Sequence, residues 1–414
     1  MRWVVLFGAT ALTVLQAGQV QAQDRSSSAL MQICDQAAAS PLDDRRPSGV
    51  SGVDAEKVDP KVAVPACEAA AKAAPTDPRV AFQLGRAYLA AKAYESALAV
   101  FEKADGLGYV LAANNLAAMY SRGLGVPVDK AHAVVLLQKA AEGGIPLAMY
   151  NLAVNYRDGT GIANDLTQAR RWFAKAAERR DPDGMNDLGA MLHNGQGGPK
   201  NLVEARQWFE RSARAGNGKA MNNLGAMLYL GDGGPRDLAQ ARHWYEKSAM
   251  AGTVEAMNIF GKMLDNGEGG PKDLAAARLW YGKAAEGGNS DAMSNFGWAL
   301  ENGHGGPRDM TEARKWYRKA ADGGSAWAKQ KLAALDAPVS SARRREAGSG
   351  RGARRGSRNP WDHAWWYDPN ISSGGSSYQV PQPQRKYYPF GSSNIPAGVF
   401  RDGAGGWQCT GFCP

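Results

Sequence analysis

The chain is poor in the residues that build metal centres and many catalytic sites. Its 414 residues include four cysteines and five histidines, and the histidines are scattered. The sequence also has no Gly-x-Ser-x-Gly, His-Glu-x-x-His, Ser-x-x-Lys or Gly-x4-Gly-Lys-Ser/Thr motif. Those motifs supply nucleophiles, zinc ligands and phosphate-binding loops. We therefore predict a non-enzymatic protein with no catalytic, metal-binding or cofactor-binding residues.

Long hydrophobic runs are missing as well. A membrane-spanning helix needs about 20 apolar residues, and the longest run, from Trp3 to Leu15, is shorter. It follows Met1-Arg2 and precedes Val20-Gln21-Ala22, the order of a secretory signal peptide. We expect residues 1–22 to be a signal peptide cleaved after Ala22, with a short membrane anchor as the alternative. The mature chain is then periplasmic or secreted and has no transmembrane segment.

All four cysteines lie outside the periodic part of the chain, at Cys34, Cys67, Cys409 and Cys413. An even number of cysteines in an exported chain favours disulfides. Three pairings exist for four cysteines, and proximity favours Cys34–Cys67 and Cys409–Cys413. A metal site is the rival interpretation, but no histidine lies close to these cysteines in the sequence.

Excess charge is nearly absent before residue 337. The formal net charge is +9, and residues 337–414 carry most of it, on arginines such as Arg343, Arg344 and Arg345. Aromatic residues follow these arginines without a helical or strand period. We expect this tail to be mostly disordered, either as a solvated extension or as a surface that binds anionic polymers or lipids. The export signal argues against nucleic acid as a partner.

The central part of the chain has a strict internal period. Tryptophans recur every 36 residues, at Trp172, Trp208, Trp244, Trp280 and Trp316. Ala-Arg precedes each of them, and Gly-x-Gly-Gly-Pro recurs, ending at Pro199, Pro235, Pro271 and Pro307. A fixed period of this length is the signature of a repeat array. At helical spacing, we expect the tryptophans to pack in the core.

The residue pattern of each repeat predicts two helices joined by the glycine turn. Gly supplies the positive φ values that end a helix, and Pro blocks its continuation. In one repeat the first helix is predicted at Ala220–Leu230 and the second at Leu238–Met250. Neither helix can bury its apolar face alone, so neighbouring units must complete the core.

These residues resemble a known family. Ala-Met-Asn-Asn-Leu-Gly-x-Met-Leu-x-x-Gly followed by Ala-Arg-x-Trp-Tyr-x-Lys-Ser-Ala-x-x-Gly is similar to the Sel1-like repeat, a relative of the tetratricopeptide repeat. Full matches cover about 180–324, and weaker copies fill 109–179. Asp77–Tyr109 lacks the glycine turn and looks more like a plain tetratricopeptide unit, while Ala326–Leu335 resembles a closing first helix without its partner.

The resemblance implies an all-α fold, a right-handed α-solenoid of helix-turn-helix repeats over 77–336. We expect an irregular disulfide-linked segment at 23–76, with a short helix near Ala66–Ala74, and the disordered tail at 337–414. By analogy with tetratricopeptide units, the first helices line a concave groove. Its candidate binding residues are Tyr150, Arg157, Asn186, His193, Asn222, Tyr229, Asn258, Lys262, Asp265, Trp298 and Glu301.

The expected function is that of a scaffold or adaptor in the bacterial periplasm or cell envelope. The groove would hold a protein or peptide partner of an envelope signalling or secretion system. The resemblance implies the signalling role, because exported Sel1-like proteins include regulators that restrain sensor kinases. One alternative is a β-lactam-binding or β-lactam-hydrolysing enzyme, but the cysteine-rich branch of the family associated with that activity carries a cysteine pair in each repeat. This array has none. The other alternative is binding of an anionic envelope polymer through the tail.

Overall fold

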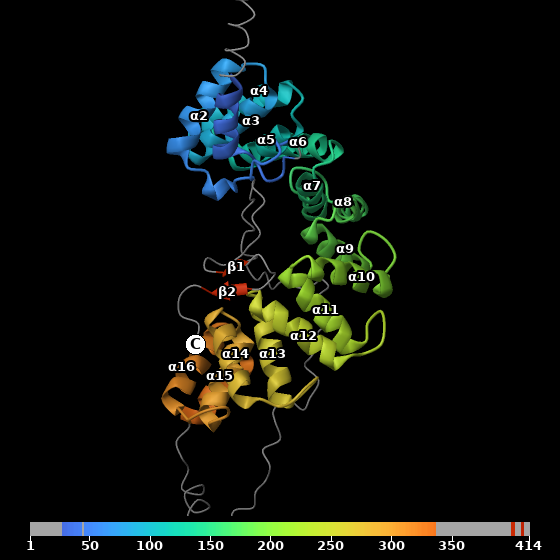
Figure 1. The fold of residues 1–414 in the computed structure, drawn as a ribbon. Coiled ribbons are helices and arrows are strands. Elements are labelled where there is room, and N and C mark those ends of the chain that lie inside the picture. Colours follow the sequence, from blue (N-terminus) through green and yellow to red (C-terminus); the bar gives the residue numbers. More distant parts are fainter. Residues whose placement is uncertain (1–26, 44, 337–398, 402–406, 410–414) are drawn as a thin grey trace, which may run out of the picture. The chain divides into compact units, whose positions relative to one another are not determined.

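The computed structural model describes residues 27–43, 45–336, 399–401 and 407–409, and those up to residue 336 fold as a stack of helix pairs (Figure 1). This confirms the predicted all-α solenoid fold. The helices are η1 Ala55–Lys57, α2 Pro60–Ala73, α3 Pro78–Ala90, α4 Tyr94–Gly106, α5 Val110–Arg122, α6 Lys130–Glu142, α7 Pro146–Asp158, α8 Leu166–Glu178, α9 Pro182–Asn194, α10 Leu202–Arg214, α11 Gly218–Leu230, α12 Leu238–Met250, α13 Val254–Asn266, α14 Leu274–Glu286, α15 Ser290–Asn302, α16 Met310–Asp322 and α17 Ala326–Asp336.

Some sequence predictions lie outside the described residues. These are the signal peptide and most of the tail, including Cys413, so the predicted Cys409–Cys413 bond is not placed. Within the tail, two short strands are described, β1 (Val399–Arg401) and β2 (Trp407–Cys409), and they pair antiparallel.

The N-terminal segment is more helical than predicted. Residues 27–38 form a helix, and α2 starts at Pro60 and continues through Pro65. Cys34 and Cys67 are fully buried and form the predicted disulfide between these two helices. The sequence suggested an irregular segment because residues 24–60 are rich in Ser, Pro, Gly and Asp and have little periodicity. Packing of Cys34, Ala38 and Ala70 into one core explains the helices, since burial outweighs weak local preference.

The helices divide into two compact units, the first ending at Gly184 and the second beginning at Met185, inside α9. In the following, the odd-numbered helices from α5 to α15 are called A helices and the even-numbered ones from α6 to α16 are called B helices. Each A helix packs against the B helix that follows it, as in α11 with α12, α13 with α14 and α15 with α16.

The glycine turn ends the A helix and starts the B helix. Gly267, at φ +74°, caps α13 in the left-handed conformation, and the Asp273 side chain accepts a hydrogen bond from the Ala276 N–H to cap α14. The Asp273 N–H donates back to the Leu264 carbonyl at 2.9 Å. These bonds satisfy helix-end groups that would otherwise be unpaired, so the predicted helix boundaries follow from local chemistry.

Small residues on the A helices let the B helices come close. In the Phe-Gly steps of α15 and α13, a Cβ added to Gly297 would lie 2.6 Å from the ring of Tyr317, and one added to Gly261 would lie 2.9 Å from the ring of Tyr281. Both tyrosines are buried. The aromatic residue after each tryptophan therefore fills the space that the glycine leaves.

The arginine of each Ala-Arg step connects consecutive repeats. The Nη1 atoms of Arg242 and Arg278 donate to the carbonyls of Pro271 and Pro307 at 2.9 Å, each in the glycine turn of the next repeat. The last such arginine, Arg314, instead contacts Asp336 and the Leu335 carbonyl at the end of α17. Consecutive repeats are thus joined by hydrogen bonds as well as by apolar packing.

The periodic tryptophans pack in the core only in part. Trp172 and Trp316 are buried, whereas Trp208, Trp244 and Trp280 are half-buried. Each ring is covered by a cation three residues further along its B helix, at 3.7 to 5.0 Å from the ring centroid. The prediction of core packing overlooked these cation–π contacts, which cover the outer faces of the rings.

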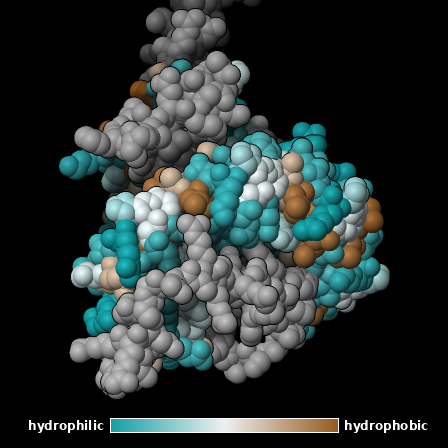
Figure 2. Space-filling model, turned by 90° about the horizontal axis from the view of Figure 1, so that it is seen from below, coloured by the Kyte–Doolittle hydropathy of each residue, from teal (hydrophilic) through white to brown (hydrophobic). Residues whose placement is uncertain are grey.

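The outer surface is mixed in character. The face of the molecule drawn in Figure 2 is mostly hydrophilic, with separate hydrophobic patches. Exposed apolar residues such as Val135 and Met250 lie on different helices. Among the residues that the structure describes, no helix combines the length and hydropathy that a membrane span requires.

Candidate functional site

The candidate site is the face of the A helices that carries the predicted groove residues, here called the A-helix face. The structure buries Tyr150, Asn186, Asn258 and Asp265. The others are half-buried, namely Arg157, His193, Asn222, Tyr229, Lys262, Trp298 and Glu301. Contacts within the fold already use most of these side chains, and their part in binding stays a prediction.

Tyr150 and Arg157, the two predicted groove residues in the first compact unit, pack against α8. The ring of Tyr150 lies 5.6 Å from that of Phe173, and the Arg157 guanidinium lies over the same Phe173 ring. Arg157 also pairs with Asp158, with Nε and Oδ1 2.7 Å apart. These contacts join α7 to α8 within one repeat.

Asparagines connect consecutive A helices in the second compact unit. The Asn223 Nδ2 donates to the Asn186 Oδ1 at 3.0 Å, joining α11 to α9. In the same way, the Asn295 Nδ2 donates to the Asn258 Oδ1 at 2.8 Å, joining α15 to α13. Each pair is separated by 37 positions, one repeat plus one residue. Asn186 and Asn258 therefore already have partners in the fold.

A second series of contacts joins the end of an A helix to the glycine turn of the next repeat. The His193 Nε2 lies 3.4 Å from the Asp232 Oδ2, and the His304 Nε2 lies 3.1 Å from the Asp265 Oδ1. Both pairs are 39 positions apart.

Tyr229 continues this series between His193 and Asp265. Burial raises the pKa of Tyr229, and the charge of Glu268 and a hydrogen bond to it add to this effect. Glu268 again lies in the glycine turn of the next repeat. Three predicted binding residues, His193, Tyr229 and Asp265, thus hold neighbouring repeats together.

Glu301 is also engaged within the fold. It accepts a hydrogen bond from the Tyr317 hydroxyl at 2.7 Å and pairs with the Lys331 Nζ at 3.0 Å. Burial, together with this hydrogen bond, raises the pKa of Tyr317. These contacts place α15, α16 and α17 against one another at the end of the array.

Asn222, Lys262 and Trp298 are the residues of the A-helix face whose side-chain chemistry best suits a ligand. They lie on the successive A helices α11, α13 and α15. Burial lowers the pKa of Lys262, opposed by the charge of Asp291. The Trp298 ring lies 4.7 Å from that of His304 and is half-buried. An amide, an ammonium group and an indole suit a polar chain with an occasional apolar side chain.

Asn222 has an unsatisfied acceptor. Its Oδ1 is buried and has no hydrogen-bond partner among the described residues. The equivalent oxygens of Asn186 and Asn258 are satisfied by an asparagine 37 positions further on. For Asn222 that position is Ile259, which has no donor. The series of asparagine pairs is therefore interrupted between α11 and α13.

The sequence reasoning missed Asn223 and Asn295, the donors of the two asparagine pairs. Two asparagines separated by 37 positions could have indicated each pair. Aligning the repeats at their period of 36 positions does not bring such asparagines together. No group of three or more His, Cys, Asp or Glu side chains within the described ranges could hold a metal ion.

The fold and the contacts that recur between consecutive repeats define an α-helical repeat protein, a class that binds partners on extended surfaces. The family model for the Sel1 repeat matches six consecutive segments, at 110–145, 146–181, 182–217, 218–253, 254–289 and 290–325. The chain therefore belongs to the Sel1 repeat family. Proteins of this family are generally scaffolds for protein interactions.

Two solved structures support this assignment. The chain is similar to c5321, a protective antigen of uropathogenic Escherichia coli with an SLR fold, at 33% identity and a TM-score of 0.62. That match covers 66% of this chain and 59% of the c5321 chain, so less than two thirds of c5321 is matched. A Sel1 repeat protein from Oxalobacter formigenes matches at 30% identity and a TM-score of 0.53, over 58% of this chain and 96% of its own. A comparison with curated proteins finds no match.

Proposed function

We propose that this protein is a non-catalytic scaffold outside the cytoplasm that holds an extended segment of a partner protein on the A-helix face of α11, α13 and α15. Membership of the Sel1 repeat family supports the scaffold role. The partner would belong to an envelope signalling or secretion system, the signalling role by analogy with exported Sel1-like proteins that restrain sensor kinases.

The disulfide supports the proposed compartment. Cys34 and Cys67 are fully buried and bonded to each other. Structural disulfides persist in the periplasm and outside the cell and are rare in the cytosol. The predicted signal peptide, which lies outside the described residues, agrees with this assignment.

The unsatisfied Oδ1 of Asn222 is the observation that carries the proposed site. Leaving a buried acceptor without a donor costs about 1–3 kcal/mol. A backbone N–H of an extended peptide would supply the missing donor, as the asparagines at 223 and 295 do for the neighbouring repeats. Lys262 and Trp298 would then contact the side chains of that peptide on the next two A helices.

Asn222→Leu is expected to weaken capture of the partner about fivefold while leaving the free energy of unfolding unchanged or raised. The loss corresponds to one hydrogen bond, about 1 kcal/mol. The measurement is quantitative pull-down from cells with the tagged mature chain, together with denaturant unfolding of the purified variants.

Asn186→Leu is the matched control. It removes an acceptor that Asn223 already uses, so it should lower stability without lowering capture. Equal capture by the Asn222→Leu variant and the unmodified chain would exclude Asn222 from the site. Capture that is lost in a chain ending at Asp336 would assign binding to the tail instead.

Ile259→Asn provides the complementary test. The new asparagine stands 37 positions after Asn222, where Asn223 and Asn295 stand relative to Asn186 and Asn258. Its Nδ2 is expected to bond with the Asn222 Oδ1, keeping stability within about 1 kcal/mol of the unmodified chain because the new bond offsets lost apolar burial. Capture should fall as it does in the Asn222→Leu variant. Unchanged capture would show that a peptide does not use this oxygen.

A further inference from the structure

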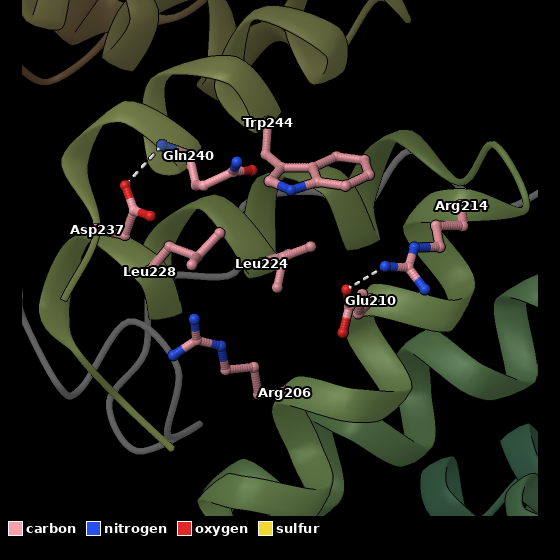
Figure 3. A pocket seen from close by; sticks show the side chains of 8 residues that line it. All are labelled: Arg206, Glu210, Arg214, Leu224, Leu228, Asp237, Gln240 and Trp244. Atoms are coloured by element: carbon pink, nitrogen blue, oxygen red, sulfur yellow. Dashed lines mark hydrogen bonds and ion pairs between the residues drawn. The ribbon is translucent and has the colours of Figure 1, made fainter. Parts of the chain in front are cut away.

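A pocket of about 320 Å³ lies between two B helices of the second compact unit, away from the A-helix residues discussed above (Figure 3). Two leucines of α11 form its apolar side, and Arg206 and Glu210 of α10 face them across the space. The lining residues are Arg206, Glu210, Arg214, Leu224, Leu228, Asp237, Gln240 and Trp244. The volume falls at the lower end of the range typical of small-molecule sites.

Leu224 stands where the next two repeats have a phenylalanine, as Leu188 and Leu152 do in the preceding repeats. In the next two repeats, the positions equivalent to Leu224 are Phe260 and Phe296, and their rings pack against Trp280 and Trp316 at 5.6 and 5.5 Å. Leu224 is too short to make the same contact with Trp244, whose ring lies beside that of His243 instead. Trp244 therefore has no phenylalanine ring of α11 packed against it, and the pocket is lined by Trp244 and Leu224 at this position.

The charged groups of the lining are not equally available. Glu210 pairs with Arg214, with 2.6 Å between Oε1 and Nη2. Asp237 caps α12 by accepting from the Gln240 N–H at 2.9 Å. Glu210 therefore has a cation as its partner, whereas Asp237 keeps its negative charge and accepts only a backbone hydrogen bond.

Arg206 is the available cation. It makes a long 3.3 Å hydrogen bond from Nη1 to the Pro235 carbonyl, where Arg242 and Arg278 make bonds of 2.9 Å to the equivalent carbonyls. Its Nε and Nη2 have no hydrogen-bond partner among the residues that the structure describes. A forked donor pair next to an apolar floor is thus left for a ligand.

We propose that this pocket binds an apolar amino-acid residue with a free α-carboxylate, such as the C-terminal residue of a peptide. The carboxylate would accept two parallel hydrogen bonds from Arg206, the geometry in which a guanidinium binds carboxylates best. The side chain would lie on Leu224 and Leu228 beneath Trp244. A phosphate dianion fits less well, because the charge of Asp237 would repel its second negative charge. This site is lined by α10, α11 and α12 and includes none of the three residues, Asn222, Lys262 and Trp298, that are proposed to hold the extended segment.

The test measures binding of N-acetyl-phenylalanine to the mature chain. The two readouts are isothermal titration calorimetry and the NMR chemical shift of the Trp244 indole N–H. We expect binding that is at least tenfold tighter than that of N-acetyl-phenylalanine amide, which lacks the carboxylate. A peptide ending in phenylalanine is the second probe. Tighter binding of the peptide would identify a protein C-terminus as the occupant, and equal binding would identify a free acylated amino acid.

Two variants make the result specific. Leu224→Phe fills the pocket as Phe260 and Phe296 do in their repeats, and should abolish binding while the protein stays folded. Arg206→Gln should weaken binding at least tenfold, whereas Arg242→Gln, which loses the equivalent bond to a proline carbonyl, should leave binding unchanged. Equal binding of acid and amide, or full binding by the Leu224→Phe variant, would overturn the proposal.

Discussion

Replacing Gly269 by alanine is expected to destabilise the repeat at 254–289 by about 3 kcal/mol or more. Gly269 has φ +70°, and an added Cβ would overlap the backbone carbonyl of Leu238, the first residue of the preceding B helix. A backbone group cannot move aside as a flexible side chain does. Denaturant unfolding, together with hydrogen exchange of α13 and α14, measures the loss.

Gly267→Ala is the control for the strain of positive φ alone. Gly267 has φ +74°, but an added Cβ would meet nothing nearer than the Lys272 Cβ at 3.4 Å. The expected cost is the strain of the left-handed conformation, about 1–2 kcal/mol. Equal losses for the two variants would show that the close contact between the turn and α12 contributes nothing.

Replacing Cys34 and Cys67 together by serine is expected to lower the stability of the N-terminal helices by about 3–4 kcal/mol, by the chain-entropy model. The bond closes a loop with a sequence separation of 33, and both sulfur atoms lie in a core shared with Val80 and Leu84 of α3. Hydrogen exchange of α2 and α3 and the thermal midpoint measure the effect.

In a repeat array, such a loss should stay near its origin because each unit contacts only its neighbours. Exchange in α13 to α16 is therefore expected to remain unchanged. The double variant of Cys409 and Cys413 serves as the control and should leave α2 and α3 unchanged. Unaltered exchange of α2 and α3 in the Cys34 and Cys67 variant would contradict a structural role for this disulfide.

The helix pairs could be predicted from the sequence because local signals and the period agree. The helices predicted at Ala220–Leu230 and Leu238–Met250 are found at Gly218–Leu230 and Leu238–Met250. Glycines at the helix ends and capping aspartates such as Asp237 act over a few residues. The Cys34–Cys67 bond was also predicted correctly, from proximity and the even cysteine count.

The use of individual side chains could not be predicted in the same way. A single repeat pattern indicates which residues face the neighbouring A helices, but it does not show whether a neighbour occupies their hydrogen-bonding atoms. Asn258 and Asp265 were expected to face a ligand, and the structure gives them Asn295 and His304 as partners. The partners come from the next repeat, at 37 and 39 positions, so the stacking of units had to be known first.

The pocket beneath Trp244 illustrates the same limit. The difference between Leu224 and Phe260 is visible in the aligned repeats, and so is the arginine at 206. The pocket itself depends on how side chains of α10, α11 and α12 pack against one another. Only the folded structure supplies that packing.

Site-specific photocrosslinking in living cells tests the central claim, that the A-helix face holds a partner protein. A benzoylphenylalanine placed at position 298 on α15 should give a discrete protein adduct. The same residue at position 279 on α14, where Leu279 is 54% exposed, should give none. Asn222→Leu should weaken the adduct at 298. An adduct at 279 with none at 298, or an adduct at 298 that is insensitive to Asn222→Leu, would contradict the account.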